Sequence, residues 1–535
     1  MTEERQPRIL ICDQLDEAAM DVFRRRKLEP KVRTGMSEAE LIQEIPGYDA
    51  VIVRSATKIT RPVIEAASEL RVVGRAGIGV DNIDCDAATE HGVVVMNTPL
   101  GNATTTAELA ITLMMSLARH IPRADRLVRS GKWSKKGLMG TELTGKTLGI
   151  IGFGRIGRIV ADRGRGLGMK IVAYDPYLDA QGGGSIPGTE LLSLDDLLLR
   201  SDFVSLHVPL TESTHNLISW ERLARIKPGA RLINASRGGV VDEEAVLDAL
   251  AEGRLAGAAF DVLTQEPPGA DHPLLQRDDV IVTPHLGASS SEAQLRVATD
   301  MAEQIADFLL KGVAQNAVNA PTLPPESMAE IAPFLLLAEK LGSFLSQRIG
   351  GPLRKVELTV AGSVSRFGIE HLRLAMLSGV LKHSLETGVN FVNAPRLAKE
   401  RGVLVLESLE EEAFYSSGEI TLRASQRAGG EAQEICGAVF GRQPRIVRVD
   451  GVSVDLPLRG PMLVTRHRDE PGVIGMLGTV LGKNGLNIRR MDLAPAKDDG
   501  GLASGFLTLY GEPERALVEE ISAMDPIESV QLLRL

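Results

Sequence analysis

The chain of 535 residues is too long for one hydrophobic core, and a typical domain of ~150 residues suggests three or four domains. With 44% apolar residues and a formal net charge of −10, it lacks the basic excess that general nucleic-acid binding requires. Its three cysteines are far apart and form no CxxC pair, so we expect a reducing compartment, no disulfide framework and no metal site. The N-terminus has no apolar signal segment and no run of ~18 uncharged apolar residues follows, which predicts a cytoplasmic protein without membrane contact.

The first hundred residues alternate short apolar strands with helical stretches. Strands are predicted at residues 8–13, 49–55, 70–77 and 92–98. Alternating β and α elements indicate a parallel sheet that is covered by helices on both faces. A complete α/β unit therefore precedes any nucleotide-binding motif.

The sequence pattern changes from Asn102, and a helix is predicted to follow with its N-terminus at Thr105. Residues 105–108 fit a capping box, and Leu109, Leu113 and Leu117 recur at helical spacing. The helix crosses from the first unit to the next. Its apolar face either packs against its own domain or contacts a second subunit, and periodicity fits both.

Residues 147–175 contain an apolar strand, the turn GFGRIG, a helix and a second strand that ends at Asp175. Gly152 permits a tight turn, Gly154 lets the backbone approach a pyrophosphate, and Gly157 lets the helix pack on the strand. The helix N-terminus offers unpaired N–H groups to the diphosphate. A carboxylate at Asp175 accepts hydrogen bonds from both ribose hydroxyls and repels a 2′-phosphate, which favours NAD over NADP. A purely structural turn is the alternative, but the surrounding strand, helix and acid favour cofactor binding.

The α/β alternation continues to about residue 289. Four more strands are predicted, at residues 202–209, 230–236, 257–262 and 279–285. With the two before them they make six, the number expected of a dinucleotide-binding sheet. A helix at 289–312 then returns the chain to the first unit. Residues 1–100 and 290–318 thus form one lobe, residues 101–289 form a nucleotide-binding domain, and a cleft separates the two.

Two further domains are predicted beyond a proline-rich linker at residues 321–327. Residues 319–455 mix amphipathic helices with strands and indicate an α+β domain. Residues 460–535 have the order βαββαβ, a ferredoxin-like arrangement. The predicted fold class is α/β: two Rossmann-like or flavodoxin-like parallel-sheet lobes, then an α+β domain and a ferredoxin-like domain.

Three side chains that could perform chemistry follow strands of the second lobe: Arg237, Glu266 and His285. Oxidation of a secondary alcohol needs a group that takes the hydroxyl proton, and histidine suits because its pKa is near neutral. A carboxylate would orient the ring, and a guanidinium would bind a substrate carboxylate. The set is typical of a 2-hydroxy acid dehydrogenase, although each residue alone is more often a solvated charge or a structural histidine. His207 is either a cofactor neighbour or a packed side chain.

Several longer segments combine these motifs, including GTELTGKTLGIIGFGRIGR, INASRGGVVDEEAV, AAFDVLTQEPP, TPHLGAS, VRSATKIT, VVGRAGIGVDNID and MNTPLGN. Over about residues 8–312 they resemble the D-isomer-specific 2-hydroxyacid dehydrogenases, and among them the long-form phosphoglycerate dehydrogenases. Residues 319–455 resemble the additional domain of the long form, and the tail resembles an ACT regulatory domain. The resemblance implies NAD-dependent oxidation of 3-phospho-D-glycerate to 3-phosphooxypyruvate, the first step of phosphorylated serine biosynthesis.

The resemblance also implies roles for individual residues. His285 is the acid/base, Glu266 its partner, and Arg237 the ligand of the substrate carboxylate. The NAD-binding residues it implies are Gly152, Gly154, Arg155, Ile156, Gly157, Asp175, Ile78, His207, Ala235, Ser236, Asp261, Leu286, Gly287 and Ala288. The substrate contacts it implies are Arg54, Ser55, Arg75, Asn102 and Lys135, with Lys136 as the alternative for the phosphate, reached across a dimer.

Regulation and assembly follow from the same resemblance. His467, Asp469 and Asn487 match the effector-binding pattern of ACT domains that bind L-serine between paired copies, whereas the alternative is that Pro471 and Gly472 merely start a helix. A homo-oligomer is implied, a dimer or tetramer, with the helix at 104–120 in the dimer interface.

Two rival functions remain. One is another D-2-hydroxyacid dehydrogenase, such as a glyoxylate or hydroxypyruvate reductase, which the regulatory tail disfavours. The other is a non-catalytic NAD(H)-sensing interaction protein on the same scaffold. The complete set of Arg237, Glu266 and His285 disfavours it.

Overall fold

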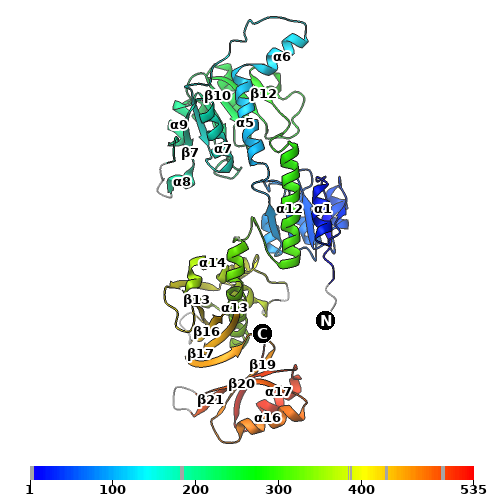
Figure 1. Cartoon of the computed structure of the whole chain (residues 1–535), viewed down its shortest axis with the longest axis vertical. Coiled ribbons are helices and arrows are strands. Elements are labelled where there is room, and N and C mark those ends of the chain that lie inside the picture. The colour runs from blue at the N-terminus through cyan, green and yellow to red at the C-terminus, as the bar shows by residue number, and fades with distance from the viewer. Residues whose placement is uncertain are drawn as a thin grey trace.

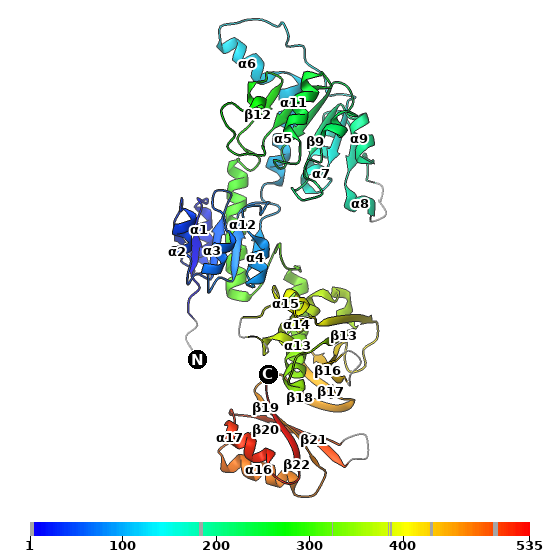
Figure 2. The same ribbon diagram turned by 180° about the vertical axis from the view of Figure 1, so that it is seen from behind.

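A computed structural model describes residues 5–180, 186–323, 325–383, 385, 388–427, 432–495 and 501–535. The chain forms four units, which we call the first lobe (residues 5–102 and 291–323), the second lobe (103–290), the third unit (325–458) and the fourth unit (461–535). They lie in a row along the long axis, with the second lobe at one end and the fourth unit at the other (Figures 1 and 2). In the described ranges, no helix is both long and apolar enough to span a bilayer.

The sheet of the first lobe is parallel and buried on both faces. Its strands are β1 (Ile9–Ile11), β2 (Lys31–Val32), β3 (Ala50–Val53), β4 (Val72–Arg75) and β5 (Val94–Asn97). Its helices are α1 (Ala18–Arg25), α2 (Glu38–Glu44), α3 (Arg61–Ala66), α4 (Cys85–Glu90) and α12 (Ser291–Lys311). The strand order is β2-β1-β3-β4-β5. Alternate strand residues face α1 and α12 on one side and α2, α3 and α4 on the other.

The second lobe contains a larger parallel sheet. Its strands are β6 (Thr147–Ile151), β7 (Lys170–Tyr174), β8 (Glu190–Leu191), β9 (Phe203–Leu206), β10 (Ala230–Asn234), β11 (Leu255–Phe260) and β12 (Val280–Val282). Its helices are α5 (Ala103–Ala118), α6 (Ile121–Arg129), α7 (Arg155–Gly166), α8 (Pro176–Ala180), α9 (Leu194–Arg200), α10 (Trp220–Leu223), α11 (Glu243–Ala251) and the 3-10 turn η1 (Pro273–Gln276). The order β12-β11-β10-β9-β6-β7-β8 reverses direction between β6 and β9, where open α/β sheets bind their ligands.

The crossover helix α5 starts earlier than the sequence pattern predicted. Asn102 is its N-cap, so the capping box predicted at residues 105–108 is wrong. The Thr106 hydroxyl instead donates to the carbonyl oxygens of Asn102 (3.0 Å) and Gly287 (2.8 Å). Leu113 and Leu117 are buried in the core of the second lobe, so the apolar face of α5 packs against its own domain.

The third unit is an α+β domain, as predicted. Its strands are β13 (Lys355–Gly362), β14 (Leu404–Glu410), β15 (Gly418–Ser425), β16 (Gln433–Phe440), β17 (Gln443–Val449) and β18 (Val452–Pro457). Its helices are α13 (Pro325–Ile349), η2 (Ser363–Phe367), α14 (Glu370–Lys382) and α15 (Ala394–Glu400). The sheet order is β14-β13-β15-β16-β17-β18, with only the β13–β14 pair parallel. Because α13 begins at Pro325, the end of the predicted linker is helical; Pro324 lies outside the described residues.

The fourth unit confirms the predicted ferredoxin-like arrangement. Its elements are β19 (Pro461–Arg468), α16 (Val473–Lys483), β20 (Ile488–Pro495), β21 (Leu502–Leu509), α17 (Arg515–Ser522) and β22 (Ile527–Arg534). The antiparallel order is β20-β21-β19-β22. One face carries Leu463 and Leu507 under the two helices. The other face, with Met462, Phe506 and Leu533, shares a core with the third unit, so the two units pack together.

Two glycines of α7 have different surroundings. A Cβ at Gly164 would lie 2.8 Å from Leu148 Cδ2 and 3.0 Å from Ile171 Cδ1, which are ends of buried strand side chains. A Cβ at Gly166 would meet no atom of the described residues within 4 Å. Gly164 therefore lets α7 approach the sheet, whereas nothing in the structure requires Gly166.

This contrast gives a stability prediction. Gly164→Ala should destabilise the protein by about 1–3 kcal/mol through overpacking. Gly166→Ala should stabilise it by up to about 1 kcal/mol because alanine is the better helix former. Thermal unfolding of the two variants measures the difference. Equal shifts in Tm would contradict the close packing at Gly164.

Candidate active site

The glycine turn between β6 and α7 is shaped by close backbone contacts. Gly152 has φ +90°, and a Cβ there would overlap the carbonyl of His207. A Cβ at Gly157 would overlap the carbonyl of Gly152, so this glycine lets the helix pack on the strand. At Gly154 no atom in the described part of the chain lies within 4 Å of a Cβ position, which leaves space for a ligand to approach the backbone.

The acid that ends β7 lies beside this turn. Asp175 accepts hydrogen bonds from the backbone N–H groups of Phe153 (2.9 Å) and Tyr177 (3.0 Å). Arg155 and Ile156 open α7, whose N-cap Gly154 contributes no side chain. The first-turn amides and the positive end of the helix dipole can therefore bind a phosphate.

His207 lies against the same turn and is held neutral. Its Nε2 is 2.9 Å from the Ser205 hydroxyl, and its enclosed Nδ1 has no hydrogen-bond partner within the described residues. Burial lowers the pKa of His207 to about 3. The space at Gly154, the Nδ1 of His207 without a partner among the described residues, and the first-turn amides of α7 together fit a bound dinucleotide.

His285 and Glu266 form a direct pair. His285 Nδ1 lies 2.8 Å from Glu266 Oε2, and Glu266 Oε1 accepts a hydrogen bond from the Leu263 N–H (3.1 Å). The two side chains are 47% and 37% exposed, so a substrate can reach them. Because Nδ1 faces the carboxylate, Nε2 is the nitrogen left for a substrate.

The loop that carries His285 is fixed by Asp261. Its carboxylate accepts hydrogen bonds from the Thr283 hydroxyl (2.6 Å) and from the N–H groups of Leu286 (2.7 Å) and Gly287 (2.9 Å). Burial raises the pKa of Asp261, although these hydrogen bonds oppose the rise. His285 itself has φ +55°, an unusual conformation that the surrounding contacts impose.

Arg237 reaches from the second lobe to the first. Its Nε donates to Asp81 Oδ2 at 2.8 Å, and its NH1 donates to the Ser236 carbonyl at 2.7 Å. A Cβ on Gly79 would overlap the guanidinium, so the arginine lies on the backbone of the loop after β4. Ala235, just before Ser236, is buried in the second-lobe core.

Two arginines of the first lobe, Arg75 and Arg54, lie near Arg237. Arg75 is largely enclosed, its Nε has no partner within the described residues, and burial lowers its pKa to about 10, with Arg237 and Arg54 adding to the effect. The Arg54 N–H donates to Asp13 at 2.6 Å, and Ser55 follows it, exposed. These arginines create a site that suits an anion.

We call the place between the two lobes where Arg237 meets Asp81, Arg75 and Arg54 the cleft. The remaining predicted residues divide between the cleft and more distant positions. The Ile78 carbonyl accepts from Asn97 (2.6 Å), and the enclosed Asn102 Oδ1 has no partner among the described residues. Leu286 is half-exposed, and Ala288 follows Gly287 in the loop that Asp261 holds. No described contact brings Lys135 or Lys136, both exposed beyond α6, to the cleft.

The predicted effector residues lie in the fourth unit. Asp469 and Asn487 are exposed, but His467 is buried in the sheet, where its Nδ1 is 3.3 Å from the Thr465 hydroxyl. Burial lowers the pKa of His467. His467 is therefore an enclosed side chain, whereas Asp469 and Asn487 are exposed.

Sequence reasoning missed three residues that shape the cleft. Asp81 pairs with Arg237, Asp13 holds the loop of Arg54, and Thr106 ties α5 to the loop of Gly287. Asp13 lies just beyond strand β1, where side chains of parallel sheets gather, and this position could have indicated its role. Asp81 lies further along the loop after β4, and its role depends on the contact with the other lobe.

Comparisons with known proteins agree with this geometry. Residues 111–287 match the family described as D-isomer specific 2-hydroxyacid dehydrogenase, NAD binding domain, and residues 330–450 match the D-3-phosphoglycerate dehydrogenase intervening domain. The chain is 42% identical to the D-3-phosphoglycerate dehydrogenase of Archaeoglobus fulgidus over 97% of its length and 98% of that protein. It is 42% identical to that of Synechocystis sp., over 99% and 95%. The crystal structure of the TT0316 protein from Thermus thermophilus superposes with a TM-score of 0.54 at 36% identity, covering 58% of this chain and 99% of that one. The chain belongs to the D-3-phosphoglycerate dehydrogenase family.

Proposed function

We propose that the chain oxidises 3-phospho-D-glycerate to 3-phosphooxypyruvate with NAD, the first step of phosphorylated serine biosynthesis. Similarity over almost the full length to named dehydrogenases supports this reaction. The observation that carries it is the His285–Glu266 pair. The pair lies beyond the strand ends of the second lobe, which also contains the glycine turn. A purely NAD(H)-sensing protein would not need this pair.

The histidine moves the proton. Bound NAD supplies the acceptor for the hydride that leaves the substrate carbon. His285 Nε2 takes the hydroxyl proton, because Nδ1 faces Glu266 and the carboxylate stabilises the imidazolium that results. The Leu263 N–H holds Glu266 in the required orientation.

The arginines bind and orient the substrate. With Nε on Asp81 and NH1 on the Ser236 carbonyl, the NH2 group of Arg237 is the donor that we propose for the substrate carboxylate. Arg75 and Arg54 add positive charge on the opposite lobe, which suits a substrate with both a carboxylate and a phosphate. We place Ser55 and Asn102 beside them as further substrate contacts.

His285→Ala should lower kcat by ~10²–10⁴, the usual contribution of a general base. His215→Ala, which removes an exposed histidine of the same lobe, should leave kcat unchanged. Steady-state assays with 3-phospho-D-glycerate and NAD measure both. Near-normal turnover of the His285 variant would refute the assignment.

Asp175→Ala should relax the preference for NAD, because the carboxylate that binds the ribose hydroxyls and repels a 2′-phosphate is lost. The ratio of kcat/KM for NAD to that for NADP measures this. Since Asp175 also accepts two backbone hydrogen bonds beside the turn, Asp175→Asn serves as the less disruptive variant. Unchanged selectivity in both variants would exclude Asp175 as the ribose ligand.

We also propose that the chain forms a homo-oligomer through the arm at residues 121–146. Helix α6 has no buried residue, and Trp133 and Met139 are each 90% exposed. Monomeric proteins rarely expose such side chains together, and the arm projects from the second lobe (Figure 1). Lys135 lies on it, and we propose that it contacts the phosphate of a substrate bound in a second copy.

Replacing Trp133 and Met139 together by serine should shift the protein toward the monomer. Light scattering after size-exclusion chromatography reports the mass. Trp220→Ser is the control, because Trp220 is also exposed but lies on α10. An unchanged mass in the double variant would exclude the arm as the interface.

For the fourth unit we propose an L-serine effector site at Asp469 and Asn487, between paired copies. A carboxylate and an amide suit the ammonium and hydroxyl groups of serine. His467 acts there only by supporting the sheet, because it is buried. Inhibition assays with L-serine test the site.

A further inference from the structure

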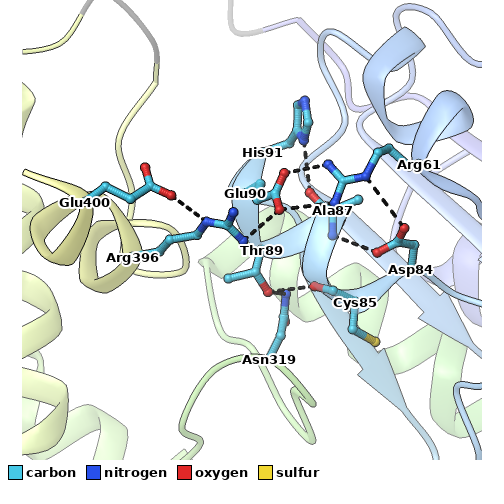
Figure 3. Close-up of polar contacts among 10 residues, drawn as sticks. All are labelled: Arg61, Asp84, Cys85, Ala87, Thr89, Glu90, His91, Asn319, Arg396 and Glu400. Atoms are coloured by element: carbon cyan, nitrogen blue, oxygen red, sulfur yellow. Dashed lines mark hydrogen bonds and ion pairs between the residues drawn. The ribbon is translucent and has the colours of Figure 1, made fainter.

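The third unit contacts the first lobe at a place separate from the chain linker (Figure 3). Arg396 NH1 lies 2.7 Å from Glu90 Oε1, and Asn390 Nδ2 donates to the Gly92 carbonyl at 2.7 Å. Between these residues Val392 is 4% exposed and belongs to the core of the first lobe. We call residues 390–396 the docking segment.

The backbone approach at this contact requires a glycine. Gly92 has φ +71°, and a Cβ there would collide with the side-chain amides of Asn390 and Asn393. The corner between α4 and β5 is therefore shaped to receive the docking segment.

The linker is attached to the same corner. The side-chain oxygen of Asn319 accepts from the Val95 N–H (2.9 Å), and its amide nitrogen donates to the Val93 carbonyl (2.9 Å) and to Thr89 (3.1 Å). The third unit thus has two attachments on one corner. It cannot rotate about the linker without breaking the docking contact.

Both charged residues of the Arg396–Glu90 ion pair have a second partner in their own unit. Glu90 also accepts hydrogen bonds from Arg61 of its own lobe at 2.5 and 3.1 Å, and Arg396 also binds Glu400 of its own helix at 2.8 Å. Hydrogen bonds from Arg61 and the charge of Arg396 lower the pKa of Glu90, which keeps it ionised. If the contact opens, each charge keeps a partner, so opening leaves no unpaired buried charge.

The other end of α4 reaches the cleft. Its N-cap is Asp84, in the same loop as Asn82. The Asn82 amide donates to the carbonyls of Arg54 (2.7 Å) and Thr57 (2.6 Å). Asp81 in the same loop binds Arg237. At 1.5 Å per residue, a helix of this length spans only about 9 Å, so a shift at one end displaces the other.

We infer that the docking segment is a latch through which the third unit sets the position of α4 and, with it, the cleft loop at residues 77–84. Opening the latch loosens Asn82 and Asp81 and so weakens the arrangement of Arg54 and Arg237. The fourth unit shares a core with the third. A conformational change in the fourth unit therefore reaches the cleft through the third unit, the docking segment and α4.

Arg396→Ala in the full-length protein tests the latch, with Lys399→Ala, an exposed cation of the same helix, as the control. Hydrogen exchange should become up to about fivefold faster in residues 84–95 and 77–83 of the Arg396 variant, the effect of losing one exposed ion pair. Lys399→Ala should match the wild type. Faster exchange confined to residues 84–95, or none at all, would overturn the inference.

A kinetic readout depends on the proposed function, whereas hydrogen exchange does not. The KM for 3-phospho-D-glycerate should rise about two- to fivefold in Arg396→Ala with kcat nearly unchanged, and Arg396→Lys should restore it in part. Asn390→Ala, which removes the second polar contact, should act in the same direction. If no variant turns over substrate, the proposed function fails; if KM is unchanged in an active Arg396→Ala enzyme, the latch fails.

Discussion

The position of the reactive histidine depends on one buried carboxylate, that of Asp261. It binds Thr283, Leu286 and Gly287 on either side of His285 and so fixes the loop in which the histidine has a left-handed backbone. Without this anchor, Nδ1 of His285 would not be held at 2.8 Å from Glu266, and Nε2 would not be fixed for a substrate. Burial of Asp261 costs solvation, which its hydrogen bonds offset in part.

The site between the two lobes contains three arginines and the acid Asp81. Arg237 belongs to the second lobe, Arg75 and Arg54 to the first, and Asp81 pairs with Arg237 across the gap. Such a cleft suits a small substrate that carries both a carboxylate and a phosphate better than a hydroxy acid with a carboxylate alone. Helix α4 joins this cleft to the corner on which the third unit docks, so the reactive site and the C-terminal units share a structural element.

Local patterns were enough to predict much of the fold. The apolar strands of both lobes, the glycine turn, the order of the fourth unit and the α+β character of the third follow from short-range periodicity and turn residues. Strands β2 and β8 were missed because two residues carry no periodic signal. The start of α5 was predicted wrongly because Thr106 bonds to Gly287, which is distant in sequence.

Some residues of the candidate site could likewise be predicted from the sequence, and others could not. His285 and Glu266 could be predicted as partners because each follows a strand of one parallel sheet, where side chains gather at the same edge. Asp81 and the docking segment could not, because their roles depend on contacts between units. His467 was expected at an effector site, but its alternating position in β19 faces the core.

The most direct test of substrate recognition by this cleft is a comparison of kcat/KM for 3-phospho-D-glycerate and for unphosphorylated D-glycerate with NAD. If the arginine-rich cleft recognises both anionic groups, the phosphorylated acid should be preferred by about 10- to 100-fold, the value of one charge-assisted hydrogen bond. Equal values, or a preference for the unphosphorylated acid, would contradict this recognition and favour a general D-2-hydroxyacid reductase.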